Sequence, residues 1–137
     1  YPEIKNYMDQ TINKAKENGY VQTLFGRKIH TPNINSKGPA AGFAKRSAIN
    51  APIQGTAADI IKLAMIKIPQ LISDNNLSSK MVLQVHDELL FEVPDEEIEI
   101  LKNKVISQME SAYYPLLTLD VPLKVEFGVG ENWNSAH

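Results

Sequence analysis

The chain has 137 residues, of which 43% are hydrophobic, and a net charge of −2. This length suits one domain with a modest core and excludes an array of several domains. The absence of cysteine excludes a disulfide scaffold and any thiolate metal site. No stretch approaches the roughly 18 apolar residues of a membrane span. We therefore expect an intracellular, cytoplasmic protein, and the abrupt start at Tyr1 suggests a piece of a longer one.

Charge is distributed unevenly along the chain. Residues 1–46 carry eight Lys and Arg against three Asp and Glu, whereas residues 47–137 carry six against thirteen. The net charge is therefore +5 in the first part and −7 in the second. One part is suited to face phosphates and the other to hold cations. Ordinary solvated surfaces are the alternative explanation.

The first half of the chain predicts helices joined by an arm. An amphipathic helix is expected over residues 2–18, with Gly19 as its C-terminal stop. The segment "YVQTLFGRKIHTP" predicts a short hairpin or extended arm. A helix then resumes near Pro39. Within "NAPIQG", Pro52 predicts a break or kink, after which "TAADIIKLAMIKIPQLI" forms a helix against a core.

The second half predicts a small sheet and a further helix. The strand-like runs "KMVLQV" and "LLFEV" predict a tight antiparallel hairpin. Residues 94–114 predict a helix with acidic residues in its first turn, and residues 121–130 alternate like a half-buried strand. The order of elements predicts an α+β fold, in which helices pack on a small antiparallel sheet made of the hairpin and the C-terminal strand.

Three ionisable residues, His86, Asp87 and Glu88, separate the two strands of the predicted hairpin. A rigid turn with adjacent carboxylates can hold a divalent cation, and the short side chain of Asp87 makes it the better ligand candidate. The alternative is that Asp87 and Glu88 merely favour a turn. Spacing alone does not decide between these two interpretations.

A second constellation lies in "RSAINAPIQGTAAD". On a continuous helix, the four-residue spacing of Arg46, Asn50 and Gln54 would align a cation and two amides along one face. Such a row can donate hydrogen bonds to the minor groove, where every base pair offers acceptors. The alternative is a set of solvated side chains around a proline break. Arg27 and Lys28 in the arm can contact phosphate, although exposed basic residues usually contact only water.

Taken together and in this order, "GYVQTLFGR", "RSAINAPIQGTAADIIKLAM", "LQVHDELLFEVP" and "VPLKVEFGVGENW" resemble family A DNA polymerases of the bacterial DNA polymerase I type. The resemblance covers essentially the whole chain. It implies a DNA-directed DNA polymerase of replication and repair, nucleoid-associated in the cytoplasm, which acts on primer-template DNA and dNTP. It also implies that the chain is the C-terminal portion of the polymerase domain, with part of its palm and fingers.

The resemblance assigns roles residue by residue. It implies that Asp87 is one of two palm carboxylates that bind the catalytic Mg²⁺ ions, with Glu88 in support and His86 near the primer terminus. Asn50 and Gln54 match minor-groove and primer-template contacts. The set of expected DNA-binding residues is Arg27, Arg46, Asn50, Gln54 and His86.

The resemblance divides the chain into a helix and basic arm (1–40), a broken helix (41–73), and a palm hairpin, helix and strand (80–137). The family's other metal-binding Asp and its nucleotide-gripping fingers helix have no counterpart here, so the two-metal site is expected to be incomplete and the chain inactive alone. A palm cut from its neighbours also exposes apolar surface, which favours self-association.

Two other functions compete with this interpretation. A metal-dependent phosphohydrolase would use His86 and Asp87 as ligands, but the other histidines, His30 and His137, lie in the arm and at the terminus. A non-catalytic module that binds duplex DNA would use the row of Arg46, Asn50 and Gln54, with the carboxylates in a structural role. Steep salt dependence without a metal requirement would identify such a module.

Overall fold

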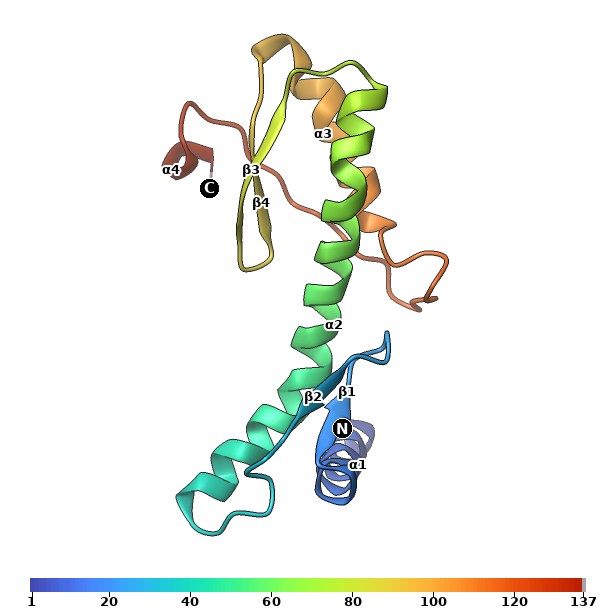
Figure 1. Cartoon of the computed structure of the whole chain (residues 1–137), viewed down its shortest axis with the longest axis vertical. Helices are drawn as coiled ribbons and strands as arrows, with labels where there is room; N and C mark the ends of the chain where they lie inside the picture. Colours follow the sequence, from blue (N-terminus) through green and yellow to red (C-terminus); the bar gives the residue numbers. More distant parts are fainter. Residues whose placement is uncertain (137) are drawn as a thin grey trace. The chain divides into compact units, whose positions relative to one another are not determined.

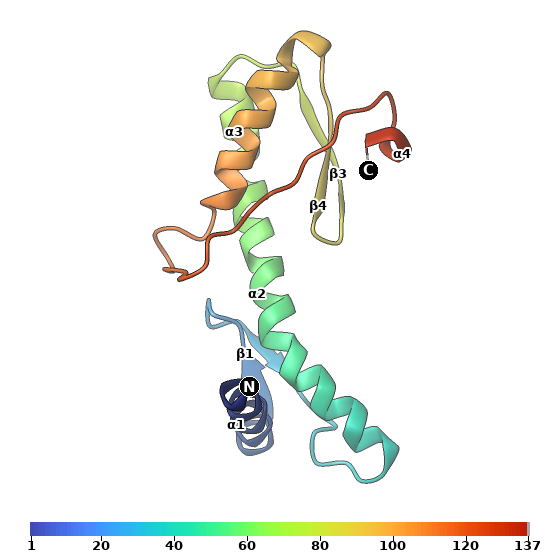
Figure 2. The same ribbon diagram turned by 180° about the vertical axis from the view of Figure 1, so that it is seen from behind.

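A computed structural model describes residues 1–136, and His137 lies outside the described residues. The chain divides into two compact units, Tyr1–Asp59 and Ile60–His137, and each is described by itself (Figures 1 and 2). The elements in chain order are α1 (Pro2–Asn18), β1 (Tyr20–Gln22), β2 (Lys28–His30), α2 (Pro39–Asp74), β3 (Lys80–Val85), β4 (Glu88–Glu92), the 3-10 helix η1 (Asp95–Glu97), α3 (Ile98–Glu110) and α4 (Trp133–Ala136).

Helix α1 forms where the sequence predicts it. Pro2 lies in the first turn, where its missing N–H costs nothing, and Gly19 ends the helix at φ 75°. This left-handed conformation lets the Gly19 N–H donate to the carbonyl of Ala15 at 2.9 Å. The expected apolar stripe is only partly covered, because Ala15 is fully buried whereas Ile4 remains 57% exposed.

The sequence predicted either a short hairpin or an extended arm, and the structure shows a short antiparallel hairpin. Strands β1 and β2 pair Tyr20 with His30 and Val21 with Ile29. The core of this unit consists of Ala15, Val21, Ile34 and Ala48, with Ile29 and Ala51 packed against it. Three of these six side chains are alanines, which allow the backbones that carry them to approach their neighbours closely.

Of the two alternatives predicted at Pro52, a break or a kink, the break is wrong, and with it the description of residues 41–73 as a broken helix. Helix α2 is continuous from Pro39 to Asp74. Proline removes one backbone donor and crowds the preceding turn, at a cost of about 3 kcal/mol. Buried Ala48 and Thr56 hold the turns on either side, and the Thr56 hydroxyl donates to the Pro52 carbonyl at 2.6 Å. Packing of the flanking turns therefore outweighs the local preference.

In the second unit, the later turns of α2 pack against α3 and the β3–β4 hairpin. Ala64 and Ile68 of α2 share a buried cluster with Leu101 and Val105 of α3. Figures 1 and 2 show α3 alongside this part of α2. The predicted helix over residues 94–114 is confirmed in its main part, but it begins as η1 and ends at Glu110.

The side chain of Glu97 fastens the start of α3 to the loop before β3. Its carboxylate accepts hydrogen bonds from the backbone N–H of Ser78 at 2.8 Å and of Ser79 at 2.9 Å, and from the Ser79 hydroxyl. These donors, with the Ser78 N–H contributing most, lower the pKa of Glu97 below its ordinary value. The Glu97 carboxylate thereby binds the two residues that precede β3.

The strand predicted over residues 121–130 is absent, because this segment has neither helix nor strand. It lies along α3: the Val125 N–H donates to Glu110 at 3.1 Å, and the Lys102 ammonium lies 4.6 Å from the Phe127 ring centroid. A strand requires a neighbouring strand edge, which alternation in the sequence cannot supply. The α+β fold class is confirmed, and residues 1–136 contain two antiparallel sheets of two strands each.

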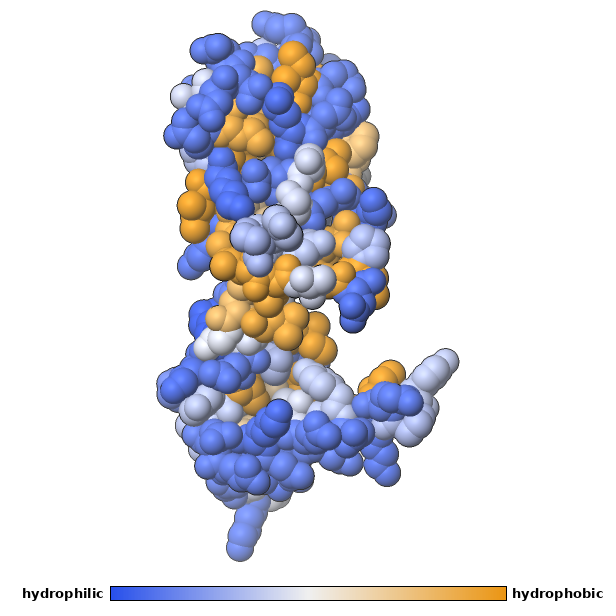
Figure 3. Space-filling model, turned by 90° about the vertical axis from the view of Figure 1, so that its right-hand side faces the viewer, coloured by the Kyte–Doolittle hydropathy of each residue, from blue (hydrophilic) through white to orange (hydrophobic). Residues whose placement is uncertain are grey.

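Many large apolar side chains reach the surface. Orange atoms on the space-filling view mark such side chains on one face (Figure 3). The most exposed include Phe43, Ile66, Leu116 and Val121. Within residues 1–136, no helix is both long enough and apolar enough to cross a membrane.

Candidate functional site

The hairpin of β3 and β4 presents the predicted ionisable residues at its tip. Val85 pairs directly with Glu88, so the turn consists of His86 and Asp87, and Glu88 is the first residue of β4. His86, Asp87 and Glu88 are all exposed. Leu89 and Phe91 of β4 pack against the core formed by α2 and α3. Alternate residues of the hairpin thus hold the turn in place while its tip faces solvent.

His86 adopts a backbone conformation that residues other than glycine rarely adopt. Its φ is 53°, in the left-handed region, where a side chain is crowded by its own backbone. The Gln84 amide donates to the His86 carbonyl at 3.1 Å and so supports the turn. Such strain persists where the surroundings fix it, and it is frequent at functional sites. A two-residue hairpin turn itself requires a positive φ, so the conformation of His86 agrees with both the turn and the site interpretation.

The chemistry of the turn suits a hard cation, but the number of ligands does not complete a site. Carboxylate oxygens are the ligands that Mg²⁺ prefers, and one or two of them usually accompany substrate phosphates and water. Asp87 and Glu88 are exposed carboxylates next to each other in the chain. Within residues 1–136, however, no group of three or more His, Asp and Glu side chains is placed to hold a metal ion. Asp87 and Glu88 therefore do not form a complete metal site by themselves within residues 1–136.

The phosphohydrolase hypothesis gains no support from the histidines. His86 lies in the second unit, whereas His30 ends strand β2 in the first. His30 stacks edge-on against Tyr20, with ring centroids 6.2 Å apart. In the part of the chain that the structure describes, neither histidine joins a cluster of three or more His, Asp and Glu side chains.

The row of Arg46, Asn50 and Gln54 lies on α2 within the first unit. Because α2 is continuous, their four-residue spacing places them along one stripe of the helix. All three side chains are exposed. Their donors are therefore accessible to a ligand along two turns of helix. This is the geometry that the sequence predicted for a continuous helix.

Arg27, in contrast, is already engaged within the protein. Its Nε lies 2.6 Å from Oδ1 of Asp59, and another guanidinium nitrogen donates to the Gly55 carbonyl at 3.1 Å. The Arg27 side chain is half exposed, while the Asp59 side chain is 16% exposed. Lys28 lies over the ring of Tyr20, 4.5 Å from its centroid. The arm thus directs Arg27 onto α2.

Sequence reasoning missed Asp59. Its signal was a lone carboxylate in the otherwise small and apolar stretch "GTAADII", placed after a basic arm. The structure brings Arg27 and Asp59 together within the first unit, and it places Arg46, Asn50 and Gln54 on the same helix as Asp59. The hairpin residues belong to the second unit and form a separate group.

Comparison with known proteins decides the family. Residues 1–135 match the description "DNA polymerase family A". The chain belongs to DNA polymerase family A. It is 52% identical over 134 residues to DNA polymerase I of Caldicellulosiruptor bescii and 48% identical over 134 residues to DNA polymerase I of Bacillus subtilis. Each match covers 97% of this chain and 15% of the relative.

A solved family A structure shares the fold. The chain is similar to the POL domain of Pol1 from M. smegmatis, solved as a complex with DNA primer-template and dNTP. The TM-score is 0.86 at 44% identity, over 96% of this chain and 23% of the solved chain. The expected family and the partial polymerase fold are therefore confirmed.

Proposed function

We propose that this chain is the part of a DNA-directed DNA polymerase that carries one catalytic carboxylate and a helix that contacts primer-template DNA. The observation that carries the proposal is the match of residues 1–135 to DNA polymerase family A. The solved relative holds primer-template and dNTP, and we assign the same partners to the polymerase that contains this chain. The reaction is addition of deoxynucleotides to a primer 3′ end in DNA replication and repair.

Asp87 is the residue that we assign to metal binding, and Glu88 supports it. Bound Mg²⁺ ions supply positive charge that stabilises the phosphoryl oxygens and the departing pyrophosphate in two-metal transfer. Asp87 lies on an exposed turn whose strands are packed on a core, so its carboxylate is held without being buried. His86, at the strained position of the same turn, is assigned to the primer terminus.

Arg46, Asn50 and Gln54 are assigned to the duplex. Amide donors along one stripe of a helix can reach the N3 and O2 acceptors that every base pair presents in the minor groove. Such contacts depend on base-pair geometry more than on base identity. The row thus suits an enzyme that must hold any sequence.

The chain alone should not catalyse extension. It spans about 15% of the length of the curated relatives that it matches, and within residues 1–136 no cluster of three metal-binding side chains is present. A lone turn with Asp87 and Glu88 does not hold two ions in register. Activity therefore requires the rest of a polymerase domain.

A chimera tests the proposal. In the chimera, residues 1–136 of this chain replace the matching segment of DNA polymerase I of Bacillus subtilis. We expect template-dependent primer extension by the chimera and none by the chain alone, each with Mg²⁺ and four dNTPs. A folded chimera that binds primer-template but extends no primer would contradict the assignment.

The alternative function is a non-catalytic module that binds duplex DNA. The exposed row of Arg46, Asn50 and Gln54 favours it over other non-enzymatic roles. Such a module would bind primer-template as the chain alone, with a steep salt dependence and no effect of Mg²⁺. The polymerase interpretation instead expects weak binding by the chain alone and strong binding by the chimera.

A further inference from the structure

The β1–β2 arm is fastened to helix α2 by contacts from consecutive turns of the helix. The Leu24 N–H donates to the Thr56 hydroxyl at 3.0 Å, and Thr56 in turn donates to the Pro52 carbonyl. Arg27 reaches the Gly55 carbonyl and the Asp59 carboxylate. The hydrogen bonds thus cover the segment of α2 that contains Gln54.

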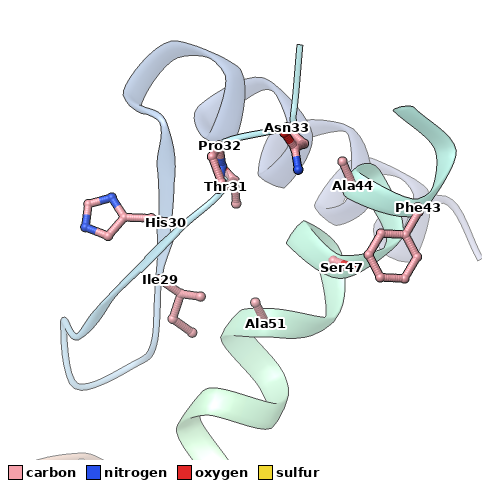
Figure 4. Close-up of a pocket in the computed structure, with 9 residues that line it drawn as sticks. All are labelled: Ile29, His30, Thr31, Pro32, Asn33, Phe43, Ala44, Ser47 and Ala51. Atoms are coloured by element: carbon pink, nitrogen blue, oxygen red, sulfur yellow. The ribbon is translucent and has the colours of Figure 1, made fainter. Parts of the chain in front are cut away.

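The arm also packs closely on the same helix. Ile29 of β2 and Ala51 of α2 face each other beside a shallow cavity of about 170 Å³ (Figure 4). A Cβ atom at Gly55 would lie 2.8 Å from both Ile29 Cδ1 and Thr23 Cγ2. Glycine is thus required at position 55 for this approach. The helix surface is fitted to the arm by shape as well as by charge.

The turn at the tip of the arm aims Arg27 at the helix. The Thr23 hydroxyl accepts hydrogen bonds from the N–H groups of Phe25 and Arg27, and the Thr23 N–H donates to the Arg27 carbonyl at 3.0 Å. Gly26 provides the positive φ of 81° that the turn requires. Because the backbone of Arg27 is fixed on both sides, its guanidinium is pre-oriented toward α2.

Asp59 depends on Arg27. One of its carboxylate oxygens, Oδ2, is buried and has no hydrogen-bond partner among residues 1–136. The other oxygen accepts from Arg27. A largely buried carboxylate is tolerated where a cation compensates its charge. Removing either partner would therefore loosen the arm from the helix.

We propose that Arg27 and Asp59 are a positioning pair that docks the arm on α2 and so fixes the helical turn that presents Asn50 and Gln54 to DNA. This inference rests on the proposed contact of Asn50 and Gln54 with the duplex. It gives Arg27 a role different from the phosphate contact that the sequence predicted. Asp59, which never faces DNA in this role, becomes a determinant of DNA binding.

The two roles of Arg27 predict opposite results for two conservative variants. In Asp59→Asn, loss of a negative charge would strengthen binding if electrostatic attraction to DNA dominated, whereas a positioning role predicts weaker binding. Arg27→Lys keeps the charge that a phosphate contact needs. Lysine lacks the planar fork with which arginine reaches two acceptors at once. A positioning role therefore predicts that Arg27→Lys weakens DNA binding even though the charge is kept.

The first measurement follows hydrogen exchange in the chain itself. The Leu24 amide should exchange about tenfold faster in Arg27→Lys and in Asp59→Asn, as expected when a charge-assisted hydrogen bond is lost. The matched control is Asp9→Asn, which removes the same charge from an exposed site on α1 and should leave exchange at Leu24 unchanged. Unchanged exchange at Leu24 in both test variants would overturn the inference.

The second measurement is primer-template affinity of the chimera as a function of salt. Both test variants should raise Kd about tenfold with an unchanged salt slope, since no phosphate contact is removed. Tighter binding by Asp59→Asn, or wild-type affinity in Arg27→Lys, would overturn the positioning role. Failure of the unsubstituted chimera to bind primer-template would instead overturn the proposed function, while the exchange result would still decide how the arm docks.

Discussion

Nε of Arg27 lies 2.6 Å from Oδ1 of Asp59, which is 32 residues further along the chain. This contact joins the tip of the β1–β2 hairpin, whose strands have three residues each, to the middle of the 36-residue helix α2. The Gly55 carbonyl, one turn before Asp59, accepts from the same guanidinium. The arm is therefore fastened to the segment of α2 that directly follows Gln54.

Gly55→Ala should weaken this docking. The added Cβ would lie 2.8 Å from two arm side chains, so the arm must shift, and overpacking of this kind costs about 1–3 kcal/mol. Denaturant unfolding of the chain measures the loss.

Gly42→Ala is the matched control, because its Cβ meets only the end of the Arg46 side chain at an ordinary 3.5 Å. Since alanine favours helix over glycine by up to about 1 kcal/mol, the control should be neutral or stabilising. Equal effects of the two substitutions would contradict the close fit at Gly55.

Glu97→Gln should change how stability depends on pH. The hydrogen bonds from Ser78 and Ser79 lower the pKa of Glu97 below its ordinary value of 4.5. A lowered folded-state pKa contributes stability that is fully present above the unfolded-state pKa and is lost as pH falls through the folded value. The variant should therefore melt at a lower temperature than the wild type at neutral pH, with a difference that shrinks as pH falls below 4.5.

Glu96→Gln provides the control for this experiment. Glu96 is exposed on the same 3-10 helix, and in the described residues it does not bind the Ser78–Ser79 loop. Its substitution should leave the melting temperature nearly unchanged at each pH. A constant difference between wild type and Glu97→Gln at every pH would show that ionisation of Glu97 is not responsible.

Asn50→Ala and Gln54→Ala should each weaken binding of primer-template by the chimera to a similar extent for all sequences. One lost hydrogen bond to a base edge corresponds to roughly a three- to tenfold rise in Kd. Uniformity follows because minor-groove acceptors are present at every base pair. Asn13→Ala on α1 removes an exposed amide and is the control. A loss confined to particular sequences would indicate direct base recognition instead.

The isolated chain should self-associate. Phe43 and Ile66 are each 68% exposed and Val121 is 75% exposed, and apolar surface of this kind is normally covered by a partner. Sedimentation across a range of concentrations should give a mass that rises above the 15.3 kDa of one chain. In the chimera, the rest of the polymerase covers these side chains, and the mass should stay constant. A chain that remains at 15.3 kDa throughout would refute this expectation.

The sequence correctly predicted elements that are determined by residues close together in the chain. Gly19 ends α1, and the runs "KMVLQV" and "LLFEV" form the β3–β4 hairpin, as the sequence predicts. Prediction failed where contacts between residues far apart in the sequence decide the structure. Pro52 does not break α2, because buried turns on both sides hold the helix, and residues 121–130 form no strand, because no strand edge pairs with them. Both outcomes depend on packing partners that a local pattern does not contain.

The candidate site was predicted in the same uneven way. Asp87 and Glu88 became candidates because they lie between two strand-like runs and match a family motif, and the row on α2 became a candidate from its four-residue spacing; their roles stay predictions. Asp59 was not found, since a single acidic residue in a helix ordinarily faces water. Its partner, Arg27, lies in a different element, and only the folded arm brings the two charges together.

The most direct test of the central claim is the rate of primer extension by the chimera with Asp87→Ala. Removal of a metal-binding carboxylate should reduce the rate about 10³-fold or more, because the ions contribute several kcal/mol to the transition state. Primer-template affinity should stay nearly unchanged, as should the extension rate of a Glu92→Ala control at the far end of β4. Extension at the wild-type rate by Asp87→Ala would contradict the assignment of this turn to the catalytic metal site.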